Sequence, residues 1–386
     1  ARPAAAGGLC RPGRGRAARA RAAIGQEGGL GGPFGRGGGA GGVHWGLPVV
    51  LVTAGVANRV LNKLALVPLT ADGHVFFLAQ FMGMCYVVVY STLLAWRAHR
   101  GLVPRAQLRY PLRPFAVIGG LEAVSLLTML TAAARLEGAL LPMLSQTFLV
   151  WQLALAVLRG KRFSGGQVGG VLLVAGGLAL AVAPGAAGSL LTPEQAPFAA
   201  LYVLSMLFPA LASTQKEVLF AEARRRLGRP LDLFVVNSYG SAFQAAFTAL
   251  LLPAMMWSQG SGLSQLGRYL WDGICCFTGA CPAAAAAGAP WFQFSYVAVN
   301  LFFNVAALRL LQVSNAVTTS VVATLVVPLA IVAFALLPLP FLSPPALSWR
   351  FWVGSSILVL GQALYTLSRG REAPPEGDAL AAKDPS

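Results

Sequence analysis

The chain has 386 residues, of which 56% are hydrophobic and only 11% are charged. Soluble domains carry about a quarter charged residues, so this composition excludes an ordinary soluble protein. The formal net charge of +16 would suit nucleic-acid binding, but the basic residues lie in the tails and between apolar segments. We therefore interpret them as a fringe that faces solvent and lipid headgroups, and we expect no nucleic-acid partner.

The first segment, residues 1–42, is rich in Arg, Ala and Gly and has a single acid, Glu27. An Arg-rich and acid-poor N-terminus is typical of organelle transit peptides. Such peptides are usually also rich in Ser, which this segment lacks, so a disordered basic tail without a targeting role is the alternative. In both cases we expect the segment to be disordered.

Ten apolar segments follow, each close to the roughly 20 residues that a helix needs to cross the hydrocarbon core. Because the backbone in lipid must form its hydrogen bonds internally, these segments predict an all-α polytopic membrane protein. The predicted spans are Gly46–Leu66, Val75–Trp96, Phe115–Ala134, Ala139–Leu158, Gly166–Pro184, Ala196–Val218, Leu233–Met256, Trp291–Leu311, Ala316–Leu337 and Ala346–Leu367.

The short segments between the spans alternate between rich and poor in Arg and Lys. By the positive-inside rule, the basic loops and both termini face the cytosol, or the stroma of a plastid. We call this face side A and the opposite face side B, where only Arg135, Arg268 and Arg350 occur. The basic residues on side A are Arg97, Arg100, Arg105, Arg109, Arg113, Arg159, Lys161, Arg162, Lys216, Arg224, Arg225, Arg226, Arg229 and Arg309.

The ten spans divide into two groups of five. A short Ala- and Arg-containing connection joins the third and fourth spans at 132–139, and a similar one joins the eighth and ninth at 306–316. Because five is odd, a second copy would be inverted, and inverted repeats with a solute site near the midplane are typical of secondary transporters. We predict two inverted five-helix repeats, 43–190 and 191–370, and a disordered tail at 371–386. Chance similarity between two helical hairpins is the alternative.

Glycine and proline mark special helices. The fifth span is Gly-rich, which favours close helix packing in membranes. Prolines inside spans are sites of helix kinks; they are Pro142, Pro209, Pro253 and Pro328.

One connection, 257–290, is long. Leu263, Leu266, Leu270 and Ile274 recur at helical spacing, with Trp271 beside them, which predicts an amphipathic helix on the side-B surface. Three cysteines on a non-cytosolic face could form a disulfide, and free thiols are the alternative. No His lies near to complete a zinc site, so we expect no metal. The cysteines are Cys275, Cys276 and Cys281.

A charged residue inside a span is costly, and its default interpretation is functional. Glu122, in the third span, could carry a proton or bind a substrate ammonium; a structural salt bridge or a position near the headgroups is the alternative. In the first span, Asn58 and Asn62 share one helix face, and Arg59 and Lys63 share another. The two cations would favour a carboxylate or phosphate in a cavity, unless they reach toward the side-B headgroups.

Amides inside the spans extend this polar set. Asn300 and Asn304 lie four residues apart on one face of the eighth span, and Gln146 lies in the fourth. Any single amide could instead join helices by hydrogen bonds worth about 0.6 kcal/mol, but the set together predicts a polar path through the bundle.

Several of these pieces together resemble the chloroquine-resistance-transporter-like proteins of the drug/metabolite transporter superfamily. The resemblance spans nearly all of 46–370. Its motifs are Ala57-Asn58-Arg59-Val60-Leu61-Asn62-Lys63, Leu121-Glu122-Ala123, Leu207-Phe208-Pro209-Ala210, Lys216-Glu217-Val218-Leu219-Phe220, the cysteine-bearing loop, Asn300-Leu301-Phe302-Phe303-Asn304 and Thr318-Thr319-Ser320-Val321-Val322.

The resemblance implies an alternating-access carrier. Plant members of the family resemble plastid-envelope carriers of glutathione and γ-glutamylcysteine, whereas parasite members move peptides, amino acids and cationic drugs with protons in a vacuole. The Ala283–Ala287 run and the cysteine content of the loop depart from the family pattern. The basic N-terminus favours the plastid branch over a vacuolar membrane.

From these residues and this resemblance we predict a secondary transporter of glutathione, γ-glutamylcysteine, amino acids or peptides, without a cofactor, acting as a monomer or homodimer. Glu122 would couple protons, and Asn58, Arg59, Asn62, Lys63, Gln146, Asn300 and Asn304 would line the cavity. A sugar-phosphate or nucleotide-sugar carrier is the alternative, and a non-transporting scaffold is a further one. No His-Glu-x-x-His motif or paired intramembrane Asp indicates an enzyme.

Overall fold

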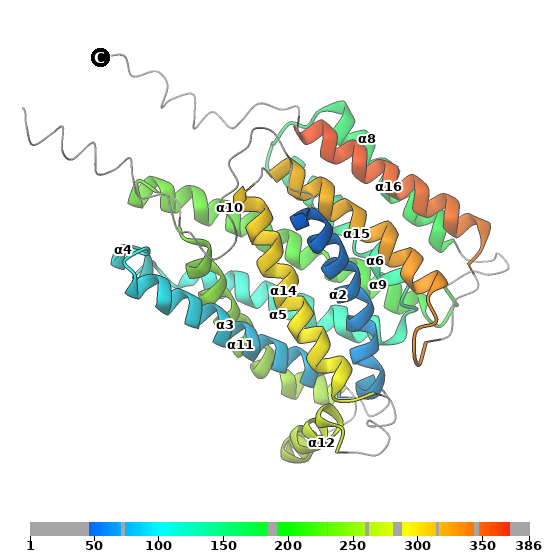
Figure 1. The fold of residues 1–386 in the computed structure, drawn as a ribbon, viewed down its shortest axis with the longest axis horizontal. Coiled ribbons are helices and arrows are strands. Elements are labelled where there is room, and N and C mark those ends of the chain that lie inside the picture. Colours follow the sequence, from blue (N-terminus) through cyan, green and yellow to red (C-terminus); the bar gives the residue numbers. More distant parts are fainter. Residues whose placement is uncertain are drawn as a thin grey trace, which may run out of the picture. The chain divides into compact units, whose positions relative to one another are not determined.

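The computed structural model describes residues 46–70, 74–183, 191–229, 231–258, 262–280, 288–313, 316–342 and 347–370. Helices are the only regular structure in this part of the chain, so the predicted all-α class is confirmed (Figure 1). The predicted N-terminal and C-terminal tails lie outside the described residues. The helices are α2 (Gly46–Thr70), α3 (Val75–His99), α4 (Arg105–Leu108), α5 (Arg113–Arg135), α6 (Leu140–Leu144), α7 (Thr147–Leu158), α8 (Gly165–Val182), α9 (Ala196–Ser205), α10 (Leu207–Leu227), α11 (Leu233–Ser258), the short 3-10 helix η1 (Leu263–Gln265), α12 (Leu266–Thr278), α14 (Trp291–Val313), α15 (Ala316–Leu336) and α16 (Trp349–Gly370).

Eight helical segments among the described residues are long and apolar enough to cross a membrane. Their ends lie within a few residues of the predicted ones, except that the sixth, α9 with α10, continues to Leu227. Helices α14 and α15 occupy the eighth and ninth predicted spans. The count of ten membrane crossings stays a prediction, because length and composition identify eight in the described part.

Two of the predicted proline sites coincide with breaks in a helix. The fourth span divides into α6 and α7 just after Pro142, and the sixth divides into α9 and α10 just before Pro209. Proline lacks an N–H and clashes with the carbonyl of the preceding turn, which favours the break before Pro209. The break between α6 and α7 lies on the C-terminal side of Pro142, where this clash does not act. Pro253 and Pro328 instead lie inside the helices α11 and α15.

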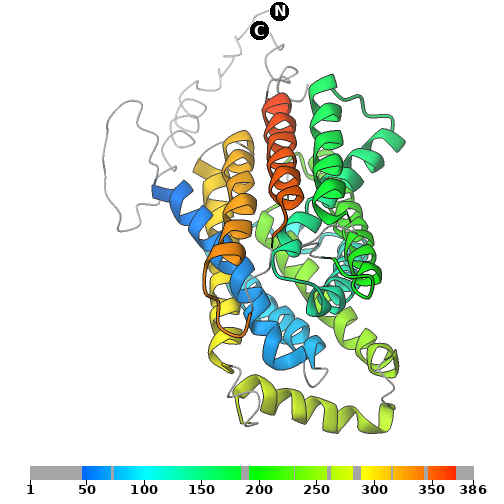
Figure 2. The ribbon, with the colours of Figure 1, turned by 90° about the vertical axis from the view of Figure 1, so that its right-hand side faces the viewer.

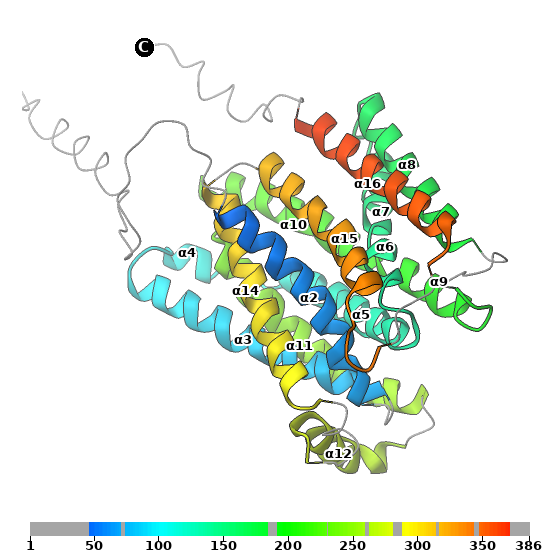
Figure 3. The ribbon, with the colours of Figure 1, turned by 45° about the vertical axis from the view of Figure 1, so that its right-hand side comes forward.

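Helices α8 and α16 lie side by side (Figures 1 and 3) and approach so closely that glycines form their contact. A Cβ atom on Gly177 would lie 2.5 Å from the Gly354 carbonyl oxygen, and one on Gly170 would lie 2.7 Å from that of Gly361. The prediction that the fifth span packs closely through glycine is therefore confirmed.

We expect Gly177→Leu to destabilise the protein, because the added side chain would collide with the α16 backbone. Overpacking of this kind costs about 1–3 kcal/mol. The matched control is Gly176→Leu, since nothing lies within 4 Å of a Cβ at Gly176. The measurement is the melting temperature of both variants in the same detergent, and equal melting temperatures would contradict the proposed contact.

The apolar core is continuous toward side B and divided toward side A. Near side B, one cluster of buried residues includes parts of α2, α3, α5, α8, α12, α15 and α16. Near side A, two separate clusters occur among the described residues. One contains Leu94, Phe115, Leu219 and Val235 of α3, α5, α10 and α11, and the other contains Leu51, Ala306, Leu310 and Val322 of α2, α14 and α15.

The helix predicted in the long connection is present as α12, which lies across the ends of neighbouring helices (Figure 2). It packs on α2 and α3 through a buried face of Tyr269, Gly273, Cys276 and Phe277. The apolar residues singled out in the sequence do not all lie on this buried face, because Ile274 is 42% exposed and Trp271 is 66% exposed. Gly273 fixes this face, since a Cβ there would lie 2.9 Å from the Phe77 ring.

The three loop cysteines remain a prediction as a disulfide site. Cys275 is half-buried and Cys276 is buried in α12, whereas Cys281 lies outside the described residues. No cluster of His, Cys, Asp or Glu suited to a metal ion occurs in the described part of the chain.

Candidate functional site

Arg59 of α2 lies among hydroxyl groups from several helices. Its Nη1 donates a hydrogen bond of 3.4 Å to the Ser145 hydroxyl, at the break between α6 and α7. The hydroxyls of Tyr202, on α9, and Tyr296, on α14, are its electrostatic neighbours. No acidic side chain forms an ion pair with Arg59 among the residues described. The guanidinium therefore has a neutral hydrogen-bond acceptor in Ser145, and no acidic group in the described structure compensates its positive charge.

An amide and hydroxyl network lies beside it and joins α2, α3 and α14. The Asn300 Nδ2 donates to Asn58 Oδ1 at 3.0 Å, and the Tyr86 hydroxyl donates to Asn300 Oδ1. The Asn304 Nδ2 donates to the Tyr86 hydroxyl at 3.2 Å and to the Asn300 carbonyl at 2.9 Å. Of the predicted cavity residues, Asn58 in the first half of the sequence thus contacts Asn300 in the second half, and Asn300 contacts Asn304.

Two further predicted residues border the same group. Asn62 hydrogen-bonds the hydroxyl of Tyr296, which also neighbours Arg59. Gln146 is buried, and its Nε2 donates to the Pro142 carbonyl and to the Ser145 hydroxyl, both at 3.3 Å. Gln146 therefore stabilises the helix break that presents Ser145 to Arg59.

Three tyrosines of this site were missed by the sequence analysis. Tyr86, Tyr202 and Tyr296 carry their hydroxyls on aromatic rings that fit an apolar helix, so they do not interrupt the hydropathy pattern. The signal that could have found them is position. Tyr296 precedes Asn300 by one helical turn and thus shares the face of Asn300 and Asn304.

Lys63 has different hydrogen-bond partners from the other residues of its motif. Its Nζ donates to the carbonyls of Ala133, at 2.9 Å, and Leu136, at 2.5 Å, at the end of α5. A cation at a helix C-terminus stabilises the unpaired carbonyls and the negative end of the helix dipole. Lys63 is only 8% exposed, so the alternative that it reaches into the headgroups is wrong. Among the described contacts it stands apart from Arg59.

Glu122 forms an ion pair with Lys216 of α10, with 2.6 Å between Oε1 and Nζ. Both side chains are partly exposed, at 24% and 34% respectively. Lys216, expected among the loop charges of side A, lies inside α10. The salt bridge that we considered as an alternative role for Glu122 is therefore present, and proton coupling stays a prediction.

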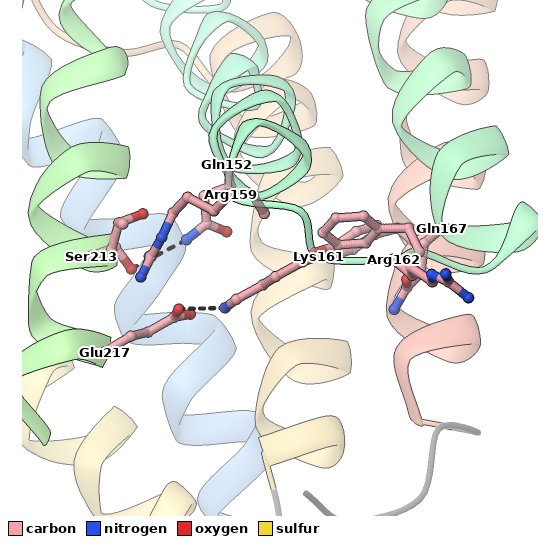
Figure 4. A pocket seen from close by; sticks show the side chains of 11 residues that line it. Gln152, Arg159, Lys161, Arg162, Gln167, Ser213 and Glu217 are labelled. Carbon is pink, nitrogen blue, oxygen red and sulfur yellow. Dashed lines mark hydrogen bonds and ion pairs between the residues drawn. The ribbon is translucent and has the colours of Figure 1, made fainter. Parts of the chain in front are cut away.

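A cavity of about 530 Å³ opens near the side-A ends of α7, α10 and α16; we call it the side-A pocket (Figure 4). Within it, Gln152 Nε2 donates to the Ser213 hydroxyl at 3.2 Å, and Lys161 pairs with Glu217 at 2.6 Å. Its cations are among the residues expected from the sequence to be loop charges of side A. Its described lining consists of Gln152, Ala156, Arg159, Lys161, Arg162, Phe163, Gln167, Ser213, Thr214, Glu217 and Tyr365.

Helices long enough to span a membrane therefore surround a polar group to which both halves of the sequence contribute. Residues 47–365 match the family described as CRT-like, chloroquine-resistance transporter-like, and the chain belongs to this family. The resemblance inferred from the motifs is thereby confirmed.

Curated relatives indicate which branch of the family this chain resembles. Protein CLT3, chloroplastic, of Arabidopsis thaliana is 43% identical over 322 residues, which cover 82% of this chain and 71% of that protein. Protein CLT2, chloroplastic, of the same plant is 43% identical over 325 residues, covering 83% and 74% respectively. The chloroquine resistance transporter of Toxoplasma gondii is 26% identical and covers 64% of this chain and 30% of its own length. The chain is therefore a multi-pass protein of a plastid membrane, as predicted.

Proposed function

We propose that this protein is an alternating-access carrier of the plastid envelope for a small solute that bears a carboxylate. The solute class is glutathione, its precursor γ-glutamylcysteine, or related amino acids and peptides. The observation that supports this proposal best is Arg59, a permanently charged side chain inside a membrane-spanning helix without an acidic partner in the described structure.

The free energy of this arrangement favours an anionic ligand. A charged side chain at the centre of a membrane costs about 2.5–3.5 kcal/mol on insertion scales. The hydroxyls of Ser145, Tyr202 and Tyr296 offset part of that cost without cancelling the charge. A solute carboxylate would complete the site, because a guanidinium can donate two parallel hydrogen bonds to it.

The neutral groups beside Arg59 suit the remainder of a peptide-like solute. Asn58, Asn62, Asn300 and Asn304 offer both donors and acceptors, which can satisfy amide and amino groups. Because these amides already bond one another across α2, α3 and α14, a solute that replaces those bonds would couple binding to helix movement. This is what an alternating-access carrier requires, and no chemical step on the solute is needed.

Contacts between helices support the proposed pair of inverted repeats. Helix α2 packs on α14 and α15, and at the corresponding place in the second half α9 and α10 pack on α5, with α10 also on α7. Helices α3 and α11 contact each other, as do α8 and α16, which is the pattern expected when corresponding helices of two repeats meet at a pseudo-two-fold axis. We also propose that Glu122 couples solute transport to proton movement.

Uptake by purified protein in liposomes tests the function. We expect saturable uptake of labelled glutathione, competed by γ-glutamylcysteine but not by an amidated glutathione that lacks free carboxylates. Protein-free liposomes are the control. Equal competition by the amidated analogue would contradict a carboxylate site. Competition by glucose 6-phosphate alone would favour the sugar-phosphate carrier, whose phosphate a guanidinium also binds.

A further inference from the structure

We infer that the side-A pocket is a second anion-binding site, separate from Arg59, that takes a carboxylate of the solute on its way between side A and the centre of the protein. The identity of the solute rests on the proposed function, whereas the anion site itself rests on the pocket.

The charge of the pocket is the first argument. Three of its described lining residues, Arg159, Lys161 and Arg162, are cationic, and one, Glu217, is acidic. Figure 4 shows Arg159 extending on the side of Ser213 and Glu217, whereas Arg162 extends away toward Gln167. Lys161 is neutralised by Glu217, and no ion pair of Arg159 is found in the described part of the chain. Arg159 is therefore a cation in the pocket without an anionic partner among the described residues.

The polar groups behind Arg159 are the second argument. Ser145, Gln152 and Arg159 follow one another at intervals of seven residues, which is close to two helical turns, or about 10 Å of rise. Gln152 and Arg159 therefore lie near one face of the fourth span, and Ser145 lies at the turn just before α7. Ser145 contacts Arg59 and Gln152 contacts Ser213, so this row of hydrogen-bonding groups leads from the central guanidinium to the side-A pocket.

Glu217 also supports an anion site, because it already places a carboxylate in the pocket. Its Oε2 lies 2.6 Å from the Lys161 Nζ, and about half of each side chain is exposed. Exposed ion pairs of this kind are weak, at about 0.2–1 kcal/mol, so a solute carboxylate can replace Glu217 at Lys161. Arg159 is then available for a bidentate contact with the same anion.

Equilibrium binding of labelled glutathione and labelled succinate to the full chain in phosphatidylcholine nanodiscs tests the inference. All variants carry Arg59→Gln, which removes the central guanidinium. We expect Arg159→Gln to weaken binding about three- to tenfold, the range for losing one charged contact in a solvated site. Glu217→Gln should strengthen binding, because Lys161 loses its competitor. That opposite direction cannot arise from misfolding.

The matched control is Arg105→Gln, which removes an exposed side-A arginine outside the described lining of the pocket. Equal affinities of the Arg105→Gln and Arg159→Gln variants would overturn the inference. So would a loss of all anion binding in the Arg59→Gln background. Nanodiscs with added phosphatidylglycerol distinguish a lipid headgroup from a free anion, and occupancy by the lipid without succinate binding would also overturn it. Because binding requires no transport, a failed glutathione uptake assay would refute the proposed function while leaving this test intact.

Discussion

Arg59→Gln is expected to reduce carboxylate-solute uptake about a hundredfold while leaving the protein folded. The change removes the charge that attracts the carboxylate, and an interaction of a charged group worth about 3 kcal/mol corresponds to roughly this factor. Stability should hold or rise, because an uncompensated charge leaves the membrane. The measurements are initial uptake rates in liposomes and the melting temperature in detergent.

The control for this prediction is Arg59→Lys, which keeps the charge but loses the planar pair of donors. An ammonium cannot reproduce bidentate geometry, so this variant should retain an intermediate uptake rate and a higher Michaelis constant. Unchanged uptake by Arg59→Gln, with a normal melting temperature, would show that the guanidinium does not bind the solute and would remove the main support for a carboxylate carrier.

The ion pair of Glu122 and Lys216 gives the second large effect. Glu122→Gln should abolish the dependence of uptake on a pH gradient, because no carboxylate remains there to carry a proton. The variant should also lose stability, since Lys216 is left partly buried without its partner. Breaking a fully buried pair costs about 3–5 kcal/mol, and the partial exposure of both side chains makes a smaller loss the expectation.

Exchanging the two residues separates structure from coupling. Glu122→Lys combined with Lys216→Glu keeps an ion pair between α5 and α10 and should recover the melting temperature. If Glu122 is the proton site, gradient dependence should not return, because the carboxylate now stands on the other helix. Recovery of both properties would contradict an assignment of the proton site to position 122 and would show that a carboxylate on either helix suffices. Arg226 and Glu222 form a more exposed pair on α10, outside the described lining of the side-A pocket, and exchanging these two residues is the control for reversing the order of the charges.

The sequence predicted the helices well and the site in part, for different physical reasons. Hydrophobic length determines where a helix can cross lipid, so α2 begins at Gly46 and α3 at Val75, as expected. Polar residues inside spans are rare because they are costly, which is why Asn58, Arg59 and Asn300 could be singled out. What they contact depends on how helices distant in sequence pack, and no local pattern carries that information.

The differences follow from the same limit. Lys63 shares a helix face with Arg59, but its ammonium meets the carbonyl end of α5, an acceptor that only the folded bundle supplies. Cations that the sequence analysis assigned to loops belong, with Ser213 of α10, to the side-A pocket. In α12, Gly273 admits the Phe77 ring, and a residue without a side chain gives no signal in a hydropathy pattern.

In the proposed alternating-access cycle, the unequal division of the apolar core would favour a resting state that is open to side A. Near side A, the described structure has two separate apolar clusters. Closing that side would bring two already packed surfaces into contact. Near side B, the helices share one apolar core. Opening that side would separate this core and expose its apolar surface, at a free-energy cost of about 25 cal/mol per Å². Without bound solute, the proposed carrier would therefore rest open to side A, the face predicted to meet the stroma, and solute binding would supply the free energy for the opposite state.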